Sequence, residues 1–279
     1  MTIAELLAEA RRALAAAPFA PVSREAGLLL GRVLGFSEAQ LLARSDTPVP
    51  PAEEGRFRRL LERRLRGEPV SYLTKEREFY GRTFHVDQRA LIPRPETEHL
   101  IEAALARELP PRPWIFDLGT GSGAIALTLA LELPGSRVIA SDLSLDALAV
   151  AAINRRRYGL EDRVVLLACD LADAVALPQI DMLVSNPPYI DPADRSSLSP
   201  EIRDFEPDIA LYASGRGLAI VERVLTTASN LRSGVPLLIE VGAGQSKQLQ
   251  RRLPNASLAI EETKRDYAGI ERIVVLKRR

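Results

Sequence analysis

One short motif combines residue types that could hold a planar NH2 group for a reaction. In Asn186-Pro-Pro-Tyr189, the Asn186 side-chain oxygen and the Pro187 carbonyl both accept hydrogen bonds, and Tyr189 adds an aromatic face. Two acceptors that converge on one NH2 group suit an amide or an aromatic amine. The alternative is an ordinary proline-rich turn, because Asn-Pro pairs commonly begin turns. The position of the motif directly after an apolar run favours the functional interpretation.

A second motif is the glycine-rich loop Asp117-Leu-Gly-Thr-Gly-Ser-Gly123, which lies between an apolar run and a helical segment. Glycines at alternate positions let the backbone approach a ligand closely, and the following helix N-terminus offers free amide donors. Asp142 ends the next apolar run, where a ribose diol would need a carboxylate acceptor. The spacing Gly119-x-Gly121-x-Gly123 differs from the Gly-x-Gly-x-x-Gly dinucleotide fingerprint. The loop therefore predicts a nucleotide-type cofactor, and by itself leaves a nicotinamide dinucleotide as a competitor.

Apolar runs and helical segments alternate around both motifs. We expect strands at 114–118, 137–141, 163–168, 181–185 and 236–241, with further extended runs at 257–261 and 272–276. We expect helices at 96–109, 124–133, 144–158, 218–231 and 246–253. Continuous apolar strands that alternate with helices indicate an α/β fold with a parallel sheet covered on both faces. Ligands bind at the carboxyl ends of such strands, so both motifs should meet at one edge of the sheet.

The first 75 residues have a helical pattern. Apolar residues at helical spacing predict four helices, at about 3–14, 28–34, 37–42 and 57–65. Ser37 is the expected N-cap of the third, with Leu41 and Leu42 on its apolar side. We therefore expect a small helical bundle domain over 1–75, a hairpin and linker over 76–95, and the α/β domain over 96–279.

The fourth predicted helix carries six arginines on its expected outer side: Arg56, Arg58, Arg59, Arg63, Arg64 and Arg66. A charge run of this kind is usually a solvated helix face, and that interpretation is favoured. The alternative is a docking surface for an acidic or RNA-bearing partner.

The composition excludes several classes of protein. The 279 residues contain 37 basic and 37 acidic side chains, and a zero net charge argues against a bulk polyanion binder. A single cysteine, Cys169, forbids an internal disulfide and a multi-cysteine metal site, and His85 and His99 have no cysteine near them. We find neither a signal-peptide pattern nor 18 consecutive apolar residues. We expect a cytoplasmic monomer with no metal and no membrane anchor.

Both motifs resemble those of methyltransferases. The glycine loop, preceded by Asp117, resembles the S-adenosylmethionine loop of Rossmann-like methyltransferases. The tetrapeptide at 186–189 matches the (Asn/Asp)-Pro-Pro-(Tyr/Phe) motif of amino-methyltransferases.

Further segments narrow the resemblance to the peptide-chain-release-factor glutamine N5-methyltransferase (PrmC/HemK) family, over essentially the whole chain. The segments are Gly67-Glu-Pro-Val-Ser-Tyr-Leu, Arg77-Glu-Phe-Tyr, Leu91-Ile-Pro-Arg-Pro-Glu-Thr-Glu, Asp117–Gly123, Val184-Ser-Asn-Pro-Pro-Tyr-Ile, Phe205-Glu-Pro and Leu238-Ile-Glu. The resemblance implies a Rossmann-like methyltransferase fold with a mostly parallel seven-stranded sheet and a helical substrate-recognition domain at 1–75. It also implies methyl transfer from S-adenosylmethionine to the glutamine amide nitrogen in the Gly-Gly-Gln loop of class-1 release factors.

The same resemblance implies the site residues. For the cofactor they are Asp117, Gly119, Thr120, Gly121, Ser122, Gly123, Asp142, Asp170, Leu171 and Asn186. Many relatives have an aromatic residue near the position of Leu171, so stacking on adenine is not implied here.

Substrate binding is implied for Asn186, Pro187, Pro188, Tyr189 and Arg94, with catalytic roles for Asn186, Pro187 and Tyr189. The alternative for Arg94 is a salt bridge to Glu96 or Glu98.

Three other functions compete. A DNA adenine methyltransferase shares both motifs but would normally have a basic cleft, whereas residues 1–76 hold 12 basic and 10 acidic side chains. We therefore expect no direct DNA binding. A ribosomal-protein glutamine methyltransferase is closer, and only the helical domain and the Ile-Pro-Arg-Pro segment argue against it. A non-enzymatic cofactor-binding module would not need Asn186-Pro-Pro-Tyr189.

Overall fold

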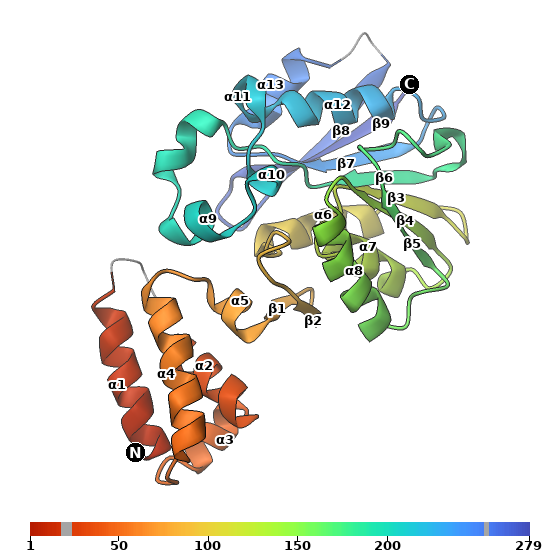
Figure 1. The fold of residues 1–279 in the computed structure, drawn as a ribbon. Helices are drawn as coiled ribbons and strands as arrows, with labels where there is room; N and C mark the ends of the chain where they lie inside the picture. Colours follow the sequence, from red (N-terminus) through yellow and green to blue (C-terminus); the bar gives the residue numbers. More distant parts are fainter. Residues whose placement is uncertain (18–23, 254–256) are drawn as a thin grey trace. The chain divides into compact units, whose positions relative to one another are not determined.

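The structure is a computed structural model that describes residues 1–17, 24–253 and 257–279 (Figure 1). The chain forms two compact units. One consists of Met1–Glu76 with Leu198–Phe205, and the other of Arg77–Ser197 with Glu206–Arg279. The segment Leu198–Phe205 therefore belongs to the first unit although it follows Asn186-Pro-Pro-Tyr189 in the sequence.

The first unit is helical. Its helices are α1 (Ile3–Ala15), α2 (Glu25–Leu34), α3 (Glu38–Ala43), α4 (Pro51–Leu65), α5 (Val70–Thr74) and α9 (Pro200–Phe205). Ser37 caps α3 as predicted, and Gly35 ends α2 with a left-handed φ of 69°. The expectation that Leu42 packs inward is wrong, because its side chain is 68% exposed while Leu41 is buried. A helix of six residues buries only one narrow stripe, and adjacent residues point about 100° apart.

The arginines of α4 do not form the uniformly basic outer face that the sequence suggested. Arg64 is 1% exposed and pairs with Glu25 of α2 and with Glu201 of α9. Arg56, Arg58 and Arg63 also have carboxylate partners, which are Glu53, the pair Glu9 and Glu54, and Glu68. These ion pairs neutralise much of the positive charge of the helix.

The second unit contains a seven-stranded sheet with strand order β5-β4-β3-β6-β7-β9-β8 (Figure 1). The strands are β3 (Trp114–Leu118), β4 (Arg137–Asp142), β5 (Val164–Ala168), β6 (Met182–Ser185), β7 (Pro236–Glu240), β8 (Leu258–Arg265) and β9 (Glu271–Arg278). The first five are parallel, whereas β9 pairs antiparallel with both β7 and β8. The predicted mostly parallel α/β sheet is confirmed.

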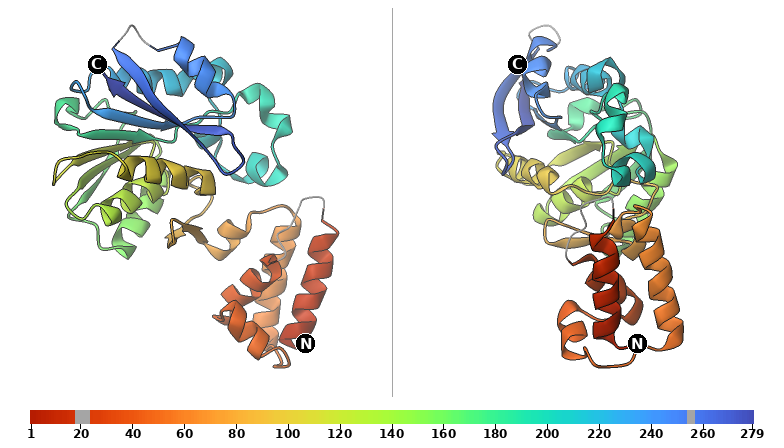
Figure 2. Two further views of the ribbon diagram at one scale, coloured as in Figure 1. Left: turned by 180° about the vertical axis from the view of Figure 1, so that it is seen from behind. Right: turned by 90° about the vertical axis from the view of Figure 1, so that its left-hand side faces the viewer.

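Helices cover both faces of this sheet (Figure 2). The longer elements are α6 (Glu98–Leu105), α7 (Ala124–Glu132), α8 (Leu145–Arg157), α12 (Ala219–Ala228) and α13 (Gln245–Arg251). The short ones are β1 (Glu76–Phe79), β2 (Arg82–His85), η1 (Pro95–Thr97), η2 (Leu177–Gln179), η3 (Pro192–Ser197), α10 (Asp208–Leu211) and α11 (Ser214–Gly217). Alternate strand residues enter opposite cores: Leu238 packs with α6 and α7, and its neighbours Leu237 and Ile239 pack with α12.

The helix predicted at 96–109 is shorter than expected. It starts as the 3-10 turn η1 and continues as α6, which ends at Leu105. Pro110 and Pro111 follow, and since a residue before proline is disfavoured in the α conformation, the helix does not extend to Leu109 as predicted. Within the ranges that the structure describes, none of the helices has the length and apolar character needed to cross a bilayer.

Candidate active site

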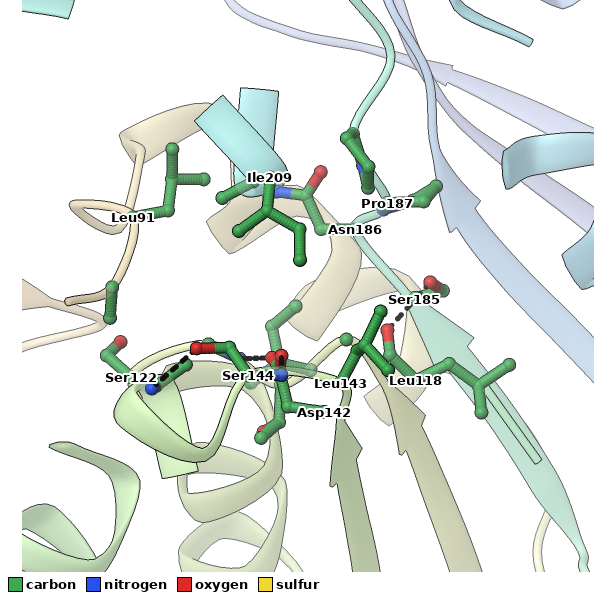
Figure 3. A pocket seen from close by; sticks show the side chains of 18 of the residues that line it. Leu91, Leu118, Ser122, Asp142, Leu143, Ser144, Ser185, Asn186, Pro187 and Ile209 are labelled. Carbon is green, nitrogen blue, oxygen red and sulfur yellow. Dashed lines mark hydrogen bonds between the residues drawn. The ribbon is translucent and has the colours of Figure 1, made fainter. Parts of the chain in front are cut away.

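A pocket lies in the second unit at the carboxyl ends of the parallel strands, where the glycine loop meets the Asn-Pro-Pro-Tyr motif (Figure 3). In Figure 3, Asn186 and Pro187 lie across the pocket from Asp142 and Leu143. Ser185 donates its hydroxyl to the carbonyl of Leu118 at 2.8 Å, which ties the ends of β6 and β3 together. The sheet therefore brings the two predicted motifs to one site.

The glycine loop between β3 and α7 has a backbone that glycine adopts readily. Gly119, Gly121 and Gly123 have φ angles of 73°, 56° and 83°. The N–H groups of Gly119 and Thr120 donate to the Ser141 carbonyl at 2.9 and 2.8 Å, which anchors the loop to β4. The part of the loop that lines the pocket consists of Gly119, Thr120, Gly121 and Ser122.

Two predicted cofactor residues lie behind this loop and not in the pocket wall. Asp117 is fully buried, and its Oδ2 accepts the Thr120 hydroxyl proton at 2.7 Å. Burial raises the pKa of Asp117 to about 7. A Cβ at Gly123 would meet Leu127 Cδ1 of α7 at 3.0 Å and Ala151 Cβ of α8 at 3.3 Å, so this glycine lets the start of α7 lie close to α8. Both residues act on the shape of the loop.

Asp142 lies at the end of β4 and lines the pocket, as predicted. Its Oδ2 accepts the Gly121 N–H and its Oδ1 accepts the Ser144 N–H, both at 2.8 Å. Burial raises its pKa, and these backbone hydrogen bonds oppose the shift. A carboxylate has about four lone-pair sites, so Asp142 can still accept from a ligand hydroxyl.

Asp170 and Leu171 also line the pocket. Asp170 pairs with Arg223 of α12 at 2.9 Å. Leu171 has a φ of 49°, and its carbonyl accepts the Ser141 hydroxyl proton at 2.8 Å. The loop after β5 is therefore tied to the end of β4.

The Asn-Pro-Pro-Tyr motif divides into two parts. Asn186, Pro187 and Pro188 line the pocket. Tyr189 does not: its hydroxyl lies 3.4 Å from Oε1 of Glu240, and burial raises its pKa. That the Tyr189 ring lies beside the site stays a prediction.

Arg94 lines the pocket and donates to Glu206 Oε1 at 2.6 Å. Arg94 therefore does form a salt bridge, but its partner is Glu206 and not Glu96 or Glu98. Pro207 follows Glu206 and also lines the pocket, so this ion pair joins the segment before α6 to the segment before α10.

Four residues with clear roles were missed in the sequence. Leu143 is 60% exposed and lines the pocket beside Asp142, which suits contact with an apolar ring. Asn154 is fully buried in α8, and its Nδ2 donates to the Ser122 carbonyl at 2.9 Å. Thr97 and Glu240 connect to Asn186 through hydrogen bonds. Asn154 could have been noticed in the sequence, because it is a polar residue on the apolar side of a predicted helix.

The described residues contain no group of three or more His, Cys, Asp and Glu side chains that could hold a metal ion. The pocket instead combines carboxylates, backbone N–H groups and apolar side chains at one end with amide and carbonyl acceptors at the other. Such a set can hold a nucleoside and present it to an NH2 group.

Comparison with known proteins shows what this chain is similar to. Residues 5–74 match the PrmC N-terminal domain, and residues 98–203 match the methyltransferase small domain. A release factor glutamine methyltransferase from Cereibacter sphaeroides is 40% identical over 275 residues, 98% of each chain. The chain belongs to the release factor glutamine methyltransferase family. Other members are those of Bordetella pertussis (45% identity, 89% of this chain and 92% of that one) and Chlorobaculum tepidum (42%, 88% and 87%).

Solved structures share the fold of the second unit. The hMettl16 catalytic domain in complex with the MAT2A 3'UTR hairpin 6 has a TM-score of 0.56 at 18% identity, covering 75% of this chain and 80% of that chain. A methyltransferase from Pyrococcus furiosus has a TM-score of 0.53 at 16% identity, covering 71% and 90%. The predicted Rossmann-like methyltransferase fold is confirmed. Family membership also confirms the predicted enzyme class, an S-adenosylmethionine-dependent methyltransferase.

Proposed function

We propose that this chain transfers a methyl group from S-adenosylmethionine to the side-chain amide nitrogen of the glutamine in the Gly-Gly-Gln motif of class-1 release factors. The observation that carries the proposal is the orientation of the Asn186 side-chain amide. Its Nδ2 donates to the Thr97 hydroxyl at 3.1 Å, which leaves Oδ1 as an acceptor in the pocket. The Pro187 carbonyl follows it directly, so two acceptors are available for the two hydrogens of a glutamine NH2 group.

The other end of the pocket fits the cofactor. The Asp142 carboxylate would accept from the ribose hydroxyls, Leu143 would contact the adenine, and Asp170 would accept from its amino group. Asp117 and Gly123 would keep the glycine loop in shape from behind. When bound, S-adenosylmethionine supplies a sulfonium methyl group, an electrophile that needs no further activation.

The residues of the chain then act by positioning and electrostatics. An amide nitrogen is a poor nucleophile because its lone pair is delocalised into the carbonyl. Asn186 Oδ1 and the Pro187 carbonyl would fix the NH2 plane and favour the positive charge that develops on nitrogen during attack. The methylated nitrogen is acidic and releases its proton to solvent, so this scheme needs no general base.

The competing substrates are less well supported. Four arginines of α4 have carboxylate partners, so this helix offers a DNA backbone less free positive charge than its sequence suggests. The match of residues 5–74 to the PrmC N-terminal domain favours a release factor over a ribosomal protein and supports substrate recognition as the role of this helical domain. A monomer remains our prediction. So does a cytoplasmic location, since translation termination takes place in the cytoplasm.

The proposal is tested by offering purified class-1 release factor, ribosomal proteins and duplex DNA separately to the enzyme with methyl-labelled cofactor. We expect label on the release factor alone. Labelling of ribosomal protein or DNA at a higher rate would overturn the proposed substrate.

A further inference from the structure

Glu240 is a buried carboxylate that the reaction scheme does not use. It ends β7, is 1% exposed, and does not line the pocket. Burying a carboxylate is costly unless hydrogen bonds or opposite charges compensate. The side chains that donate to it are Thr97 at 2.7 Å and Tyr189 at 3.4 Å. Thr97 contacts Asn186, and Tyr189 belongs to the same tetrapeptide as Asn186.

The three side chains form one hydrogen-bonded chain with a defined direction. An ionised carboxylate only accepts hydrogen bonds, and a threonine hydroxyl has one proton to donate. Because Thr97 gives that proton to Glu240, its oxygen can only accept from Asn186. Asn186 must therefore turn its NH2 group toward Thr97 and its Oδ1 into the pocket.

This direction matters for the reaction. An asparagine amide can rotate by 180° and present NH2 where it had presented oxygen, at little steric cost. In the rotated state Asn186 would offer a donor to the glutamine NH2, which is itself a donor. The pair would then repel, and the glutamine would lose its alignment.

We propose that Glu240 and Thr97 are positioning residues that fix the orientation of the Asn186 amide, so that its oxygen faces the substrate NH2 group. The inference rests on the proposed function and deepens it. It assigns no contact with the substrate to Glu240.

Protonation of Glu240 would reverse the chain, because a neutral carboxyl group can donate to Thr97, whose own proton could then turn to Asn186. The charged and titratable groups that face Glu240 are Arg272 of β9, Glu96 of η1 and Tyr189 after β6. Burial raises the pKa of Glu240 to about 7, while Thr97 and Arg272 oppose the shift. Acidification below neutral pH should therefore slow methyl transfer.

Thr97→Val tests the inference because valine keeps the shape of threonine and removes its hydroxyl. We expect kcat to fall about 10- to 100-fold, with KM for the release factor and the Kd of the cofactor nearly unchanged. The acid-side decline of kcat should disappear, and Thr97→Ser should restore both kcat and its pH profile. Thr128→Val is the matched control: Thr128 is fully buried in α7, and its hydroxyl has no hydrogen-bond partner among the described residues.

A second measurement does not depend on turnover. In 1H–15N NMR spectra, the Asn186 side-chain NH2 signal, assigned from its absence in Asn186→Asp, should shift in Thr97→Val and stay in place in Thr128→Val. A wild-type kcat and pH profile in Thr97→Val, or an unmoved NH2 signal, would overturn the inference. Inactivity of the wild-type enzyme on release factors would instead count against the proposed function.

Discussion

Gly217→Ala is a sharp test of how the Asn-Pro-Pro-Tyr loop is held. Gly217 ends α11 with a φ of 76°, and a Cβ there would lie 2.0 Å from the Tyr189 carbonyl oxygen and 2.8 Å from Gln245 Nε2. Gln245 Nε2 itself donates to the Tyr189 carbonyl at 2.9 Å. The added methyl group would therefore push directly on the backbone that follows Asn186.

The size of the effect follows from these distances. Real Cβ atoms essentially never approach another heavy atom within 3.0 Å, so the Tyr189 carbonyl must move by about 1 Å. A misplacement of about 1 Å near the reacting groups can cost about 100-fold in rate. The left-handed backbone adds about 1–2 kcal/mol of instability for alanine. We expect kcat for release factor methylation to fall about 100-fold and the free energy of unfolding to fall by more than the backbone effect alone.

The assay is the single-turnover rate of methyl transfer at saturating release factor and cofactor, with chemical denaturation in parallel. Gly269→Ala is the matched control, since Gly269 has a φ of 78° and, among the described residues beyond its two chain neighbours, no heavy atom lies within 4 Å of the added Cβ. It should lose about 1–2 kcal/mol of stability and keep the wild-type rate. Equal rates in the two variants would show that the contact at Gly217 does not position the Asn-Pro-Pro-Tyr loop.

Three further predictions concern the pocket and the buried carboxylates. Asn186→Ala should lower kcat about 100- to 1,000-fold, while calorimetry should find nearly unchanged cofactor affinity. A near-wild-type rate would contradict the proposed role of Asn186. Asp142→Ala should weaken cofactor binding at least 10-fold by calorimetry, and unchanged affinity would contradict the ribose contact. Asp117 and Glu240 both have a pKa raised to about 7, so the native state keeps protons that the unfolded chain releases. The free energy of unfolding should therefore fall, on the order of 5 kcal/mol, as pH rises from 5 to 8, and by about half as much in Asp117→Asn; a steady rise in denaturation experiments would contradict this sign.

The sequence was sufficient to predict the sheet and the position of both motifs. Several apolar runs are followed directly by residues that can bind a ligand, and the carboxyl ends of parallel strands lie at one edge of the sheet. The glycine loop, Asp142 and Asn186 were found for this reason. The antiparallel pairing of β9 could not be derived from the pattern of its own residues. A strand that is buried on both faces has a continuous apolar sequence whether its neighbours are parallel or antiparallel.

Contacts between distant parts of the sequence were not predictable. Arg94 pairs with Glu206, which is 112 positions away, and Thr97 bonds to Glu240, which is 143 positions away. Local spacing offers only neighbours such as Glu96 as partners. The residue type shows that the Tyr189 ring is present, whereas only the fold decides which side of the loop it faces.

Mass mapping of the methylated residue identifies which atom of the release factor receives the methyl group. Release factor is incubated with the enzyme and S-adenosylmethionine, digested, and sequenced by mass spectrometry, in parallel with a release factor whose Gly-Gly-Gln glutamine is replaced by alanine. We expect one methyl group on the amide of that glutamine and none on the alanine variant. Methylation of the alanine variant at a comparable rate, or a methyl group at another residue of the wild-type factor, would contradict it.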